Sequence, residues 1–227
     1  MVKERTLRVL LVSDKVFYLR DYRTAFEKIE SSSLDYSFAF TELEGYDKAI
    51  DFIKKMDASE LFDVVCLQIS NPFGIHSQDE DGSTVGMMLR HRFPDAIIIL
   101  GANFSRTYNF WNLLKLIDPQ AVIADDFDLV SELSIHLIKA LKRPVYICPS
   151  IQVAILNHLT CKIDLDDFEQ KLLYELSKGT RMAALPSILN MSISTIEKRK
   201  KRLKERFQVE GEDDRMLILK ARESGAL

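Results

Sequence analysis

Short apolar runs alternate with longer amphipathic segments over the first 140 residues of the chain. Four of the runs are almost continuously apolar, which is typical of parallel strands covered on both faces, and the run at 36–40 is the least apolar. The pattern predicts five strand–helix units, and hence an α/β domain with a doubly wound five-stranded parallel sheet. The predicted strands are residues 7–12, 36–40, 64–69, 97–100 and 121–124. The predicted helices are residues 16–30, 46–56, 83–92, 107–116 and 129–141.

The pattern changes after residue 143. Pro149 and Ser150 open a short predicted helix that runs through residue 159, and from residue 164 onward every apolar repeat is helical. Gly179 can end the first of the later helices, because glycine readily adopts a left-handed conformation. The chain is therefore predicted to contain an α/β domain at 1–143, a linker with a short helix at 144–163 and an all-α domain at 164–227. The helices predicted in this last domain are residues 166–178, 182–189, 194–208 and 213–223.

The charge of the chain is unevenly distributed. In total, 31 Lys and Arg stand against 34 Asp and Glu, a net charge of −3, so the whole molecule is not a general binder of polyanions. Residues 1–143 contain 17 basic and 22 acidic residues, whereas residues 144–227 contain 14 basic and 12 acidic residues. This asymmetry indicates a binding module at the C-terminal end, attached to a different kind of domain.

Several functional classes lack support in the sequence. Cys66, Cys148 and Cys161 are isolated, without metal-ligand spacing, which argues against a disulfide framework or a zinc site and favours a reducing cytosol. The first apolar run stops at Ser13, too early for the core of a signal peptide or for a membrane span. The histidines have no consistent acid or thiol partner, so no hydrolase or metal-enzyme constellation is present. We expect a cytoplasmic protein that is not an enzyme, needs no cofactor or metal and does not bind a membrane.

The predicted helix at 194–208 is strongly basic. Seven of the twelve residues from Ile196 to Phe207 are Lys or Arg. Ile196, Leu203 and Phe207 recur at helical spacing and predict a buried stripe, which leaves a cationic outer surface. Ser192 and Thr195 place hydroxyl groups at the helix start, where they can cap free N–H groups or contact phosphates. A basic helix that follows a short helix and a turn is typical of insertion into the DNA major groove.

The basic helix has two other interpretations. A solvated charged helix is the first, but like charges spaced three and four residues apart repel, and opposing acids are scarce in the segment. A protein-binding adaptor, whose basic helix contacts an acidic partner, is the second and remains open. Salt-dependent binding to duplex DNA would separate it from a DNA-binding module.

Residues 164–227 resemble the DNA-binding domain of LuxR/NarL-type (NarL/FixJ) response regulators. The residues that carry the resemblance are Leu165, Glu169, Leu172, Leu173, Gly179, Leu189, Asn190, Met191, Ser192, Thr195, Ile196, Leu203, Val209, Gly225, Ala226 and Leu227. The resemblance implies that Glu197, Lys198 and Lys201 face the bases. It also implies that Thr195, Arg199 and Arg202 contact phosphates. The final helix, with Met216, Leu217 and Leu219, then supplies a dimer surface or closes the bundle.

Two residues depart from the family pattern. Pro186 falls inside the predicted second helix, where proline removes a backbone hydrogen bond and can kink or shorten the helix. Arg199 replaces the histidine that is common in the family. The operator preference of the family therefore does not carry over to this chain.

Residues 7–143 resemble the receiver domains of response regulators, which have a flavodoxin-like fold. The order of the elements fits the whole span, and residues 63–72 match the third strand and its loop. The family's phosphorylation residues match Ser13 and Asp14 for the two Mg²⁺-binding acids, Gln68 for the phosphoacceptor aspartate, Gly101 for the hydroxyl residue and Asp125 for the lysine. Only Asp14 keeps the residue type, so the receiver is predicted to be degenerate.

The loss of these residues has a chemical consequence. An acyl phosphate requires a carboxylate nucleophile, which the carboxamide of Gln68 does not offer. Asp125 reverses the charge that would pair with the phosphate. Gln68 also adds no charge, so a conformation fixed by packing is favoured over mimicry of the phosphorylated state. The alternative is phosphorylation at another acceptor, for example in the acidic loop Asp79-Glu80-Asp81.

Together these observations predict a DNA-binding transcriptional regulator whose receiver-like domain is not phosphorylated at the usual position. Its partners are expected to be double-stranded DNA and a second copy of the chain, because paired half-sites extend the footprint of a small module. A regulatory protein or a small ligand at the receiver-like domain would then replace phosphorylation as the input.

Overall fold

The structure is a computed structural model of the chain. It describes residues 5–31, 36–57, 59–69, 82–102, 110–125, 129–143 and 145–227, without the side chains of residues 110–112 and 158. The chain divides into two compact units, Met1–Ile151 and Gln152–Leu227. The division falls within the segment 144–163, for which the sequence predicts a linker. In the described part of the chain, no helix has the length and apolarity that crossing a bilayer requires.

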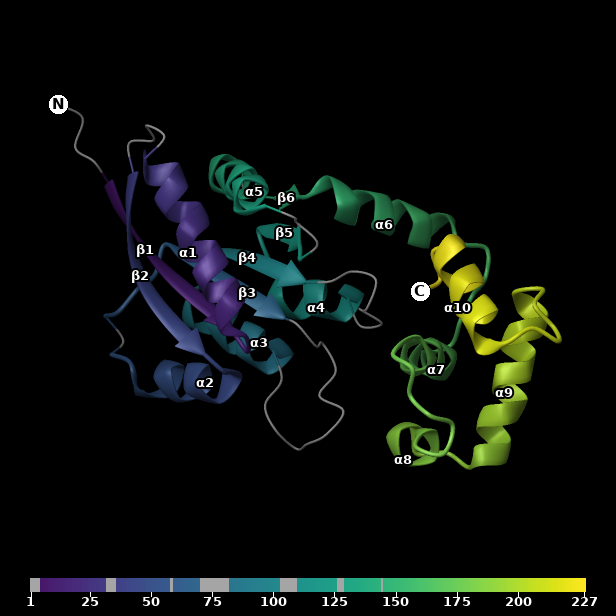
Figure 1. Ribbon diagram of the computed structural model, residues 1–227. Coiled ribbons are helices and arrows are strands. Elements are labelled where there is room, and N and C mark those ends of the chain that lie inside the picture. Colours follow the sequence, from purple (N-terminus) through teal and green to yellow (C-terminus); the bar gives the residue numbers. More distant parts are fainter. Residues whose placement is uncertain are drawn as a thin grey trace. The chain divides into compact units, whose positions relative to one another are not determined.

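The first unit is built on a parallel sheet with the strand order β2-β1-β3-β4-β5-β6 (Figure 1). The strands are β1 (Arg5–Ser13), β2 (Tyr36–Glu44), β3 (Val64–Ile69), β4 (Ile97–Ala102), β5 (Ala121–Ala124) and β6 (Tyr146–Ile147). The prediction of five strands was therefore one strand short. Strand β6 has two residues, too few to show a pattern in sequence, and it adds to the sheet edge by pairing Tyr146 with Ala121 and Ile147 with Val122.

Helices cover both faces of this sheet. Helices α1 (Val16–Ser31) and α5 (Val130–Lys142) lie on one face, and α2 (Tyr46–Lys55), α3 (Gly82–Arg92) and α4 (Phe110–Ile117) lie on the other (Figure 1). Alternate residues of β1 serve the two faces: Val9 and Leu11 pack with α1 and α5, whereas Leu10 and Val12 pack with the other layer. Burial on both faces explains why the central strands read as continuous apolar runs. The doubly wound α/β prediction is confirmed.

The second unit is entirely helical. Its elements are α6 (Pro149–Thr160), which begins in the first unit, and α7 (Asp167–Ser177), α8 (Leu185–Leu189), α9 (Ile193–Arg206) and α10 (Asp214–Glu223). Leu172, Leu185, Ile196, Leu203 and Leu217 are fully buried in one core to which α7, α8, α9 and α10 all contribute. Leu217 on α10 thus closes the bundle, the second of the two roles that the resemblance implied for this helix.

Pro186 does not interrupt a helix. The sequence places it inside a helix that starts at 182, but α8 starts at Leu185, so Pro186 lies in the first turn. The first four N–H groups of a helix have no partner within the helix, and proline therefore costs no hydrogen bond there. Asn190 then ends α8 in the left-handed region at φ 53°. The expected penalty is absent because the helix is shorter than predicted.

Candidate nucleic-acid interface and receiver-like pocket

The start of α9 is fixed by hydroxyl groups. Ser192 is the N-cap, and its side chain accepts a hydrogen bond of 3.3 Å from the backbone N–H of Thr195. The hydroxyl oxygens of Ser192 and Thr195 are 2.8 Å apart. Capping satisfies one of the free N–H groups and holds the first turn in place. Both hydroxyl residues remain exposed at the surface.

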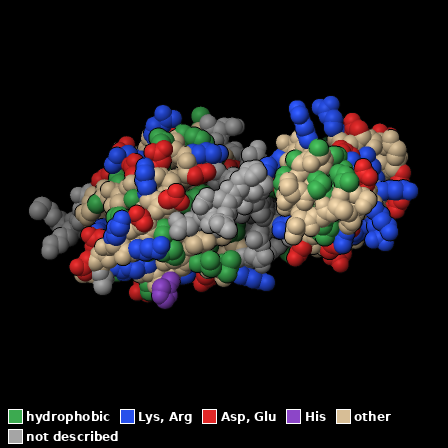
Figure 2. All heavy atoms as spheres, turned by 90° about the horizontal axis from the view of Figure 1, so that it is seen from below, with side chains coloured by type: hydrophobic (Ala, Val, Ile, Leu, Met, Phe, Trp, Pro, Cys, Tyr) green, Lys and Arg blue, Asp and Glu red, His purple; other side chains and the backbone are tan. Residues whose placement is uncertain are grey.

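The faces of α9 divide as the sequence predicts. Ile196 and Leu203 are fully buried and Phe207 is nearly so, which confirms the apolar stripe. The exposed residues include Glu197, Lys198, Lys201, Arg202 and Glu205. Figure 2 shows Lys and Arg side chains projecting from the C-terminal unit, at the right of the view, with Asp and Glu side chains among them.

Four of the seven basic residues of α9 are neutralised inside the module. Arg199 pairs with Asp166, and Arg206 pairs with Glu169 at 2.7 Å. Lys200 and Lys204 lie 2.9 and 3.0 Å from the carboxylate oxygens of Asp214. Opposing acids are scarce within the basic segment itself, but the folded chain supplies them from outside it. The acids come from the starts of α7 and α10, which are distant along the chain from the basic residues.

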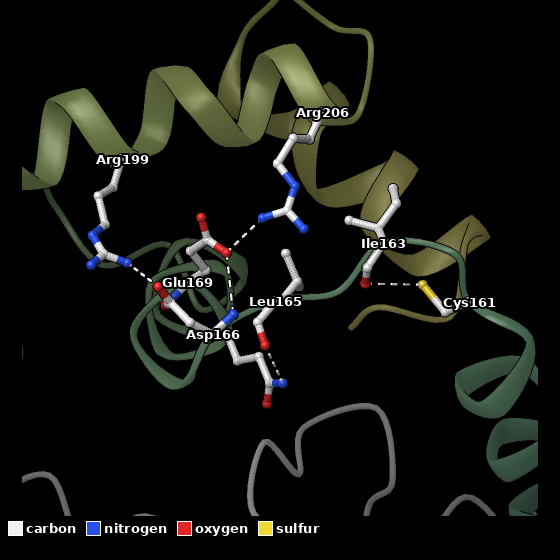
Figure 3. A network of polar contacts seen from close by, with 8 residues as sticks. Cys161, Ile163, Leu165, Asp166, Glu169, Arg199 and Arg206 are labelled. Carbon is white, nitrogen blue, oxygen red and sulfur yellow. Dashed lines mark hydrogen bonds and ion pairs between the residues drawn. The ribbon is translucent and has the colours of Figure 1, made fainter.

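The start of α7 and two arginines of α9 form one network (Figure 3). Asp166 caps α7 by accepting a 2.8 Å hydrogen bond from the N–H of Glu169, and Glu169 accepts one of 3.2 Å from the N–H of Asp166. The same two carboxylates pair with Arg199 and Arg206, which are seven residues apart and lie on one face of α9. The capping box of α7 therefore also holds α9 against α7.

Electrostatics of this network favour charged carboxylates. Burial raises the pKa of Asp166. The hydrogen bond from the Glu169 N–H and the charge of Arg199 outweigh burial and lower this pKa below its usual value. Partial burial also raises the pKa of Asp214, but hydrogen bonds from Lys200 and Lys204 outweigh it and lower this pKa. Both acids thus remain ionised at neutral pH and keep their cations paired.

Arg199, which the family resemblance assigns to a phosphate contact, makes its contacts within the module. Its guanidinium group pairs with Asp166 and lies 4.8 Å from the centre of the Phe168 ring, on the side of α7. The side chain is accordingly half-buried, and its role as a phosphate contact stays a prediction with which this pairing competes. The sequence could not show this, because Asp166 and Phe168 precede Arg199 by about 30 residues.

Three basic residues of α9 remain available to a ligand. Among the residues that the structure describes, Lys198, Lys201 and Arg202 form no ion pair and no hydrogen bond. They are spaced at i, i+3 and i+4, which places them on one exposed strip of the helix, with Glu197 beside them. Like charges this close repel one another. Binding of an anion relieves this repulsion and is therefore favourable.

The residues that match the phosphorylation residues of receivers lie at one edge of the sheet. Ser13 at the end of β1 lies opposite Gln68 of β3, and Gln68 lies opposite Gly101 of β4. Asp125 follows the last residue of β5. Asp14 follows β1 and is exposed, whereas Ser13 and Gln68 are buried. These residues lie at one edge of the sheet because the carboxyl ends of parallel strands share it.

Two tyrosines of α1, which the sequence analysis missed, fill this pocket. The hydroxyl of Tyr22 donates to Oε1 of Gln68 at 3.3 Å, and the hydroxyl of Tyr18 donates to Asp125 at 3.0 Å. Tyr22 is fully enclosed, and burial raises its pKa well above the usual value. The spacing of four residues between two tyrosines facing the sheet was the signal available in sequence.

Gln68 is held by further contacts. The hydroxyl of Tyr46 donates to the backbone carbonyl of Gln68 at 3.1 Å. A Cβ placed on Gly101 would lie 1.9 Å from Oε1 of Gln68 and 2.5 Å from the hydroxyl oxygen of Tyr22. The side-chain amide nitrogen of Gln68 is buried and has no hydrogen-bond partner among the described residues. The glutamine side chain thus occupies the space that a side chain at position 101 would need.

In the part of the chain that the structure describes, no group of three or more His, Cys, Asp or Glu side chains is placed to hold a metal ion. The acidic loop at 79–81, which the sequence offers as another phosphoacceptor, lies outside the described residues.

Solved structures of response regulators share this fold over nearly the whole chain. A structure of two RcsB dimers bound to two parallel DNAs has a TM-score of 0.55 at 20% identity, covering 96% of this chain and 98% of that one. RcsB from Salmonella enterica serovar Typhimurium, bound to promoter rprA with the phosphomimetic BeF3⁻, has a TM-score of 0.53 at 20% identity, with coverages of 94% and 97%. A complex of the two-component response regulator RcsB with DNA gives 0.53 at 22% identity, with coverages of 95% and 98%.

This chain has the fold of a full-length response regulator. In that fold the sheet unit corresponds to a receiver and the helical unit to the domain that follows it, as the sequence resemblance implied. No protein-family model and no curated protein sequence matches the chain. At these identities the likeness establishes the fold, and the roles of individual residues depend on the geometry described above.

Proposed function

We propose that this protein is a DNA-binding transcriptional regulator of the NarL/FixJ type with a receiver-like domain that is not phosphorylated at the usual position. The observation that carries the proposal is the exposed strip of Lys198, Lys201 and Arg202, which has no ion pair within the described residues and follows a hydroxyl-capped helix start. Phosphate contacts dominate the affinity of proteins for DNA, and unpaired cations provide them. The RcsB structures that share the fold are DNA complexes, which supports the same function.

The roles within α9 follow from exposure and pairing. Glu197, Lys198 and Lys201 are assigned to the base edges, where Lys and Glu recognise guanine and cytosine. Ser192, Thr195 and Arg202 are assigned to phosphates. Arg199 is reassigned as a positioning residue, since its guanidinium group is engaged by Asp166.

The domain organisation of the proposal follows the sequence. Residues 1–143 are the receiver-like domain, residues 144–163 the linker and residues 164–227 the DNA-binding domain. We place the protein in the cytoplasm, where the free thiols of Cys66 and Cys148 stay reduced.

The regulator is proposed to act as a homodimer. Five residues of α8 and fourteen of α9 form a small reading module, and one such module contacts few base pairs. Two copies on adjacent half-sites extend the footprint. The RcsB dimers bound to DNA support this assembly.

The receiver-like domain is proposed to act without an acyl phosphate. Gln68 supplies no carboxylate, the Tyr22 hydroxyl occupies the space beside it, and Asp125 adds a negative charge where a phosphate would need a cation. Input would come from a regulatory protein or a small ligand at this domain, or from the amount of the protein.

Two double variants with equal charge change test the DNA proposal. Fragments bound by the full chain are first recovered from genomic DNA, and the affinity for a labelled fragment is then measured by fluorescence anisotropy over a range of salt. Lys198→Ala/Lys201→Ala should abolish specific binding, since it removes exposed cations. Lys200→Ala/Lys204→Ala should keep it, because both lysines already pair with Asp214.

The salt dependence gives a second measure. About six neutralised phosphates in the complex predict a slope of log K against log salt near −5, and Arg202→Ala, which removes one phosphate contact from each of two copies, should make the slope less steep by about 2. Equal losses in both double variants would show a general charge effect and contradict the assignment of the reading surface. A full chain that ignores duplex DNA at low salt would favour the adaptor interpretation instead.

A further inference from the structure

Helix α6 exposes an apolar stripe that the DNA-binding role does not use. Val153, Leu156 and Leu159 are 58%, 60% and 69% exposed. They follow one another at intervals of three residues, so they are neighbours on one side of the helix. The other exposed large apolar side chains in the described part of the helical unit, Ile193 and Leu219, stand singly on α9 and α10. Isolated apolar residues are normal on a surface, whereas a contiguous group marks an interaction site.

This part of α6 belongs to the helical unit. Gly225, in the C-terminal segment, approaches α6 so closely that a Cβ on it would lie 2.6 Å from the carbonyl carbon of Asn157. Only glycine tolerates that approach, and its φ of +74° favours glycine as well. The stripe therefore keeps a fixed position relative to the helices that present the basic strip.

The composition of α6 limits what can cover the stripe. The helix Pro149–Thr160 contains no Lys, Arg, Asp or Glu. A charged partner segment would find no opposite charge on α6, whereas two copies of the same uncharged face can meet without repulsion between like charges. A symmetric interface requires this kind of self-complementary surface, because each copy presents the same residues.

The size of the stripe also points to a second copy. Stable interfaces take about 20 residues from each partner, so three side chains bind a freely diffusing protein only weakly. A second copy on the same duplex does not have to be captured, because the DNA already holds it at a high effective concentration. A small apolar contact is then sufficient to make the two copies bind cooperatively.

We propose that the α6 stripe of Val153, Leu156 and Leu159 is the contact between two copies of this chain on adjacent DNA half-sites. The proposal deepens the homodimer of the proposed function and rests on it. It assigns the contact to α6, in place of the exposed leucine of α10. In the absence of DNA the same contact produces only weak self-association.

The test compares two full-length variants with the same chemical change. Leu156→Glu alters the stripe, and Leu219→Glu alters an exposed leucine of α10 in the same unit. Native mass spectrometry with a duplex long enough for two modules reports the binding of the first and the second copy. We expect cooperativity of at least about tenfold in the wild type, its loss in Leu156→Glu and its retention in Leu219→Glu, with binding of the first copy unchanged.

Other outcomes overturn the proposal. Retained cooperativity in Leu156→Glu, or an equal loss in Leu219→Glu, would remove α6 as the contact, and so would binding of two wild-type copies without cooperativity. If the first copy does not bind DNA, the DNA function fails separately. Sedimentation equilibrium of the free chain then decides: weak self-association that Leu156→Glu reduces at least about tenfold supports the α6 contact, and a wholly monomeric wild type refutes it.

Discussion

The side chain of Gln68 fills the space beside Gly101 at the carboxyl edge of the sheet. Oε1 of Gln68 lies 1.9 Å from where a Cβ on Gly101 would be, and the hydroxyl of Tyr22 donates to the same oxygen. The two positions that match the phosphoacceptor and the hydroxyl residue of receivers are therefore coupled by packing. With the Gln68 side chain in this conformation, position 101 has no room for a Cβ.

The pair predicts a large coupling energy. Gly101→Ala should lower the free energy of unfolding of the receiver-like unit by about 1–3 kcal/mol, because the new methyl group collides with the Gln68 amide. In a Gln68→Ala background the same change should cost at least about 1 kcal/mol less, since most of the collision is gone. Urea unfolding of the wild type, the two single variants and the double variant measures this double-mutant cycle. Additive costs would show that Gln68 is not what excludes a side chain at position 101.

Restoring one acid should not restore phosphorylation. Gln68→Asp supplies the nucleophile, but Asp125 still places a negative charge, paired with Tyr18, at the position matching the receivers' lysine. The variant, incubated with a small phosphodonor and Mg²⁺, should show no added phosphoryl group by intact mass spectrometry. Efficient labelling of the variant would contradict this view of the pocket. Labelling of the wild-type chain would instead support an acceptor elsewhere.

Arg199 and Arg202 should have separable effects. Arg199→Ala leaves Asp166 without its ion pair and uncovers the Phe168 ring, so the helical unit should lose about 1 kcal/mol of stability. Arg202→Ala should leave stability unchanged, weaken binding by a similar factor for every DNA sequence, and make the slope of log K against log salt less steep by about 1 per copy, as expected for a phosphate contact. Thermal unfolding followed by circular dichroism, together with anisotropy, gives both quantities. A stable Arg199→Ala protein that no longer binds DNA would show that Arg199 contacts DNA directly.

The capping box makes Asp166 more sensitive to substitution than an ordinary surface acid. Asp166→Ala removes the cap of α7 and the Arg199 pair at once, which should cost about 1–3 kcal/mol. Asp167→Ala, one residue later, is the matched control and should cost less, because Asp167 is not the N-cap. Urea unfolding of the full chain measures both variants, and equal losses would argue against the network in Figure 3.

Acid should weaken the helical unit in a defined window. The pKa values of Asp166 and Asp214 are lowered in the folded state, so their ion pairs contribute stability above about pH 4, the pKa of an unfolded aspartate. That contribution is lost as the pH falls further through the lowered pKa values. Asp214→Asn should therefore be less stable than the wild type at pH 6, by about 1 kcal/mol, and nearly equal to it near pH 2. A constant difference across this range would mean that the ion pairs of Asp214 do not stabilise the fold.

The sequence by itself determined the order of the elements, the apolar stripe of α9 and the chemical loss at Gln68. Strands 64–69 and 121–124 coincide with the observed β3 and β5, because burial on both faces leaves a continuous apolar run. Ile196, Leu203 and Phe207 were readable because helical periodicity is a local property. The edge strand β6 was not readable, since two residues carry no period and its pairing depends on β5.

Tertiary structure alone decided which charges are free. Seven basic residues in α9 look equivalent in sequence, yet Asp166, Glu169 and Asp214 neutralise four of them and leave Lys198, Lys201 and Arg202 exposed. The folded chain likewise brought Tyr18 and Tyr22 of α1 to Asp125 and Gln68. Ion pairs and side-chain packing act over a few ångströms in space and do not depend on how far apart the residues are along the chain. The sequence therefore revealed the kinds of residues present, and only the fold revealed their partners.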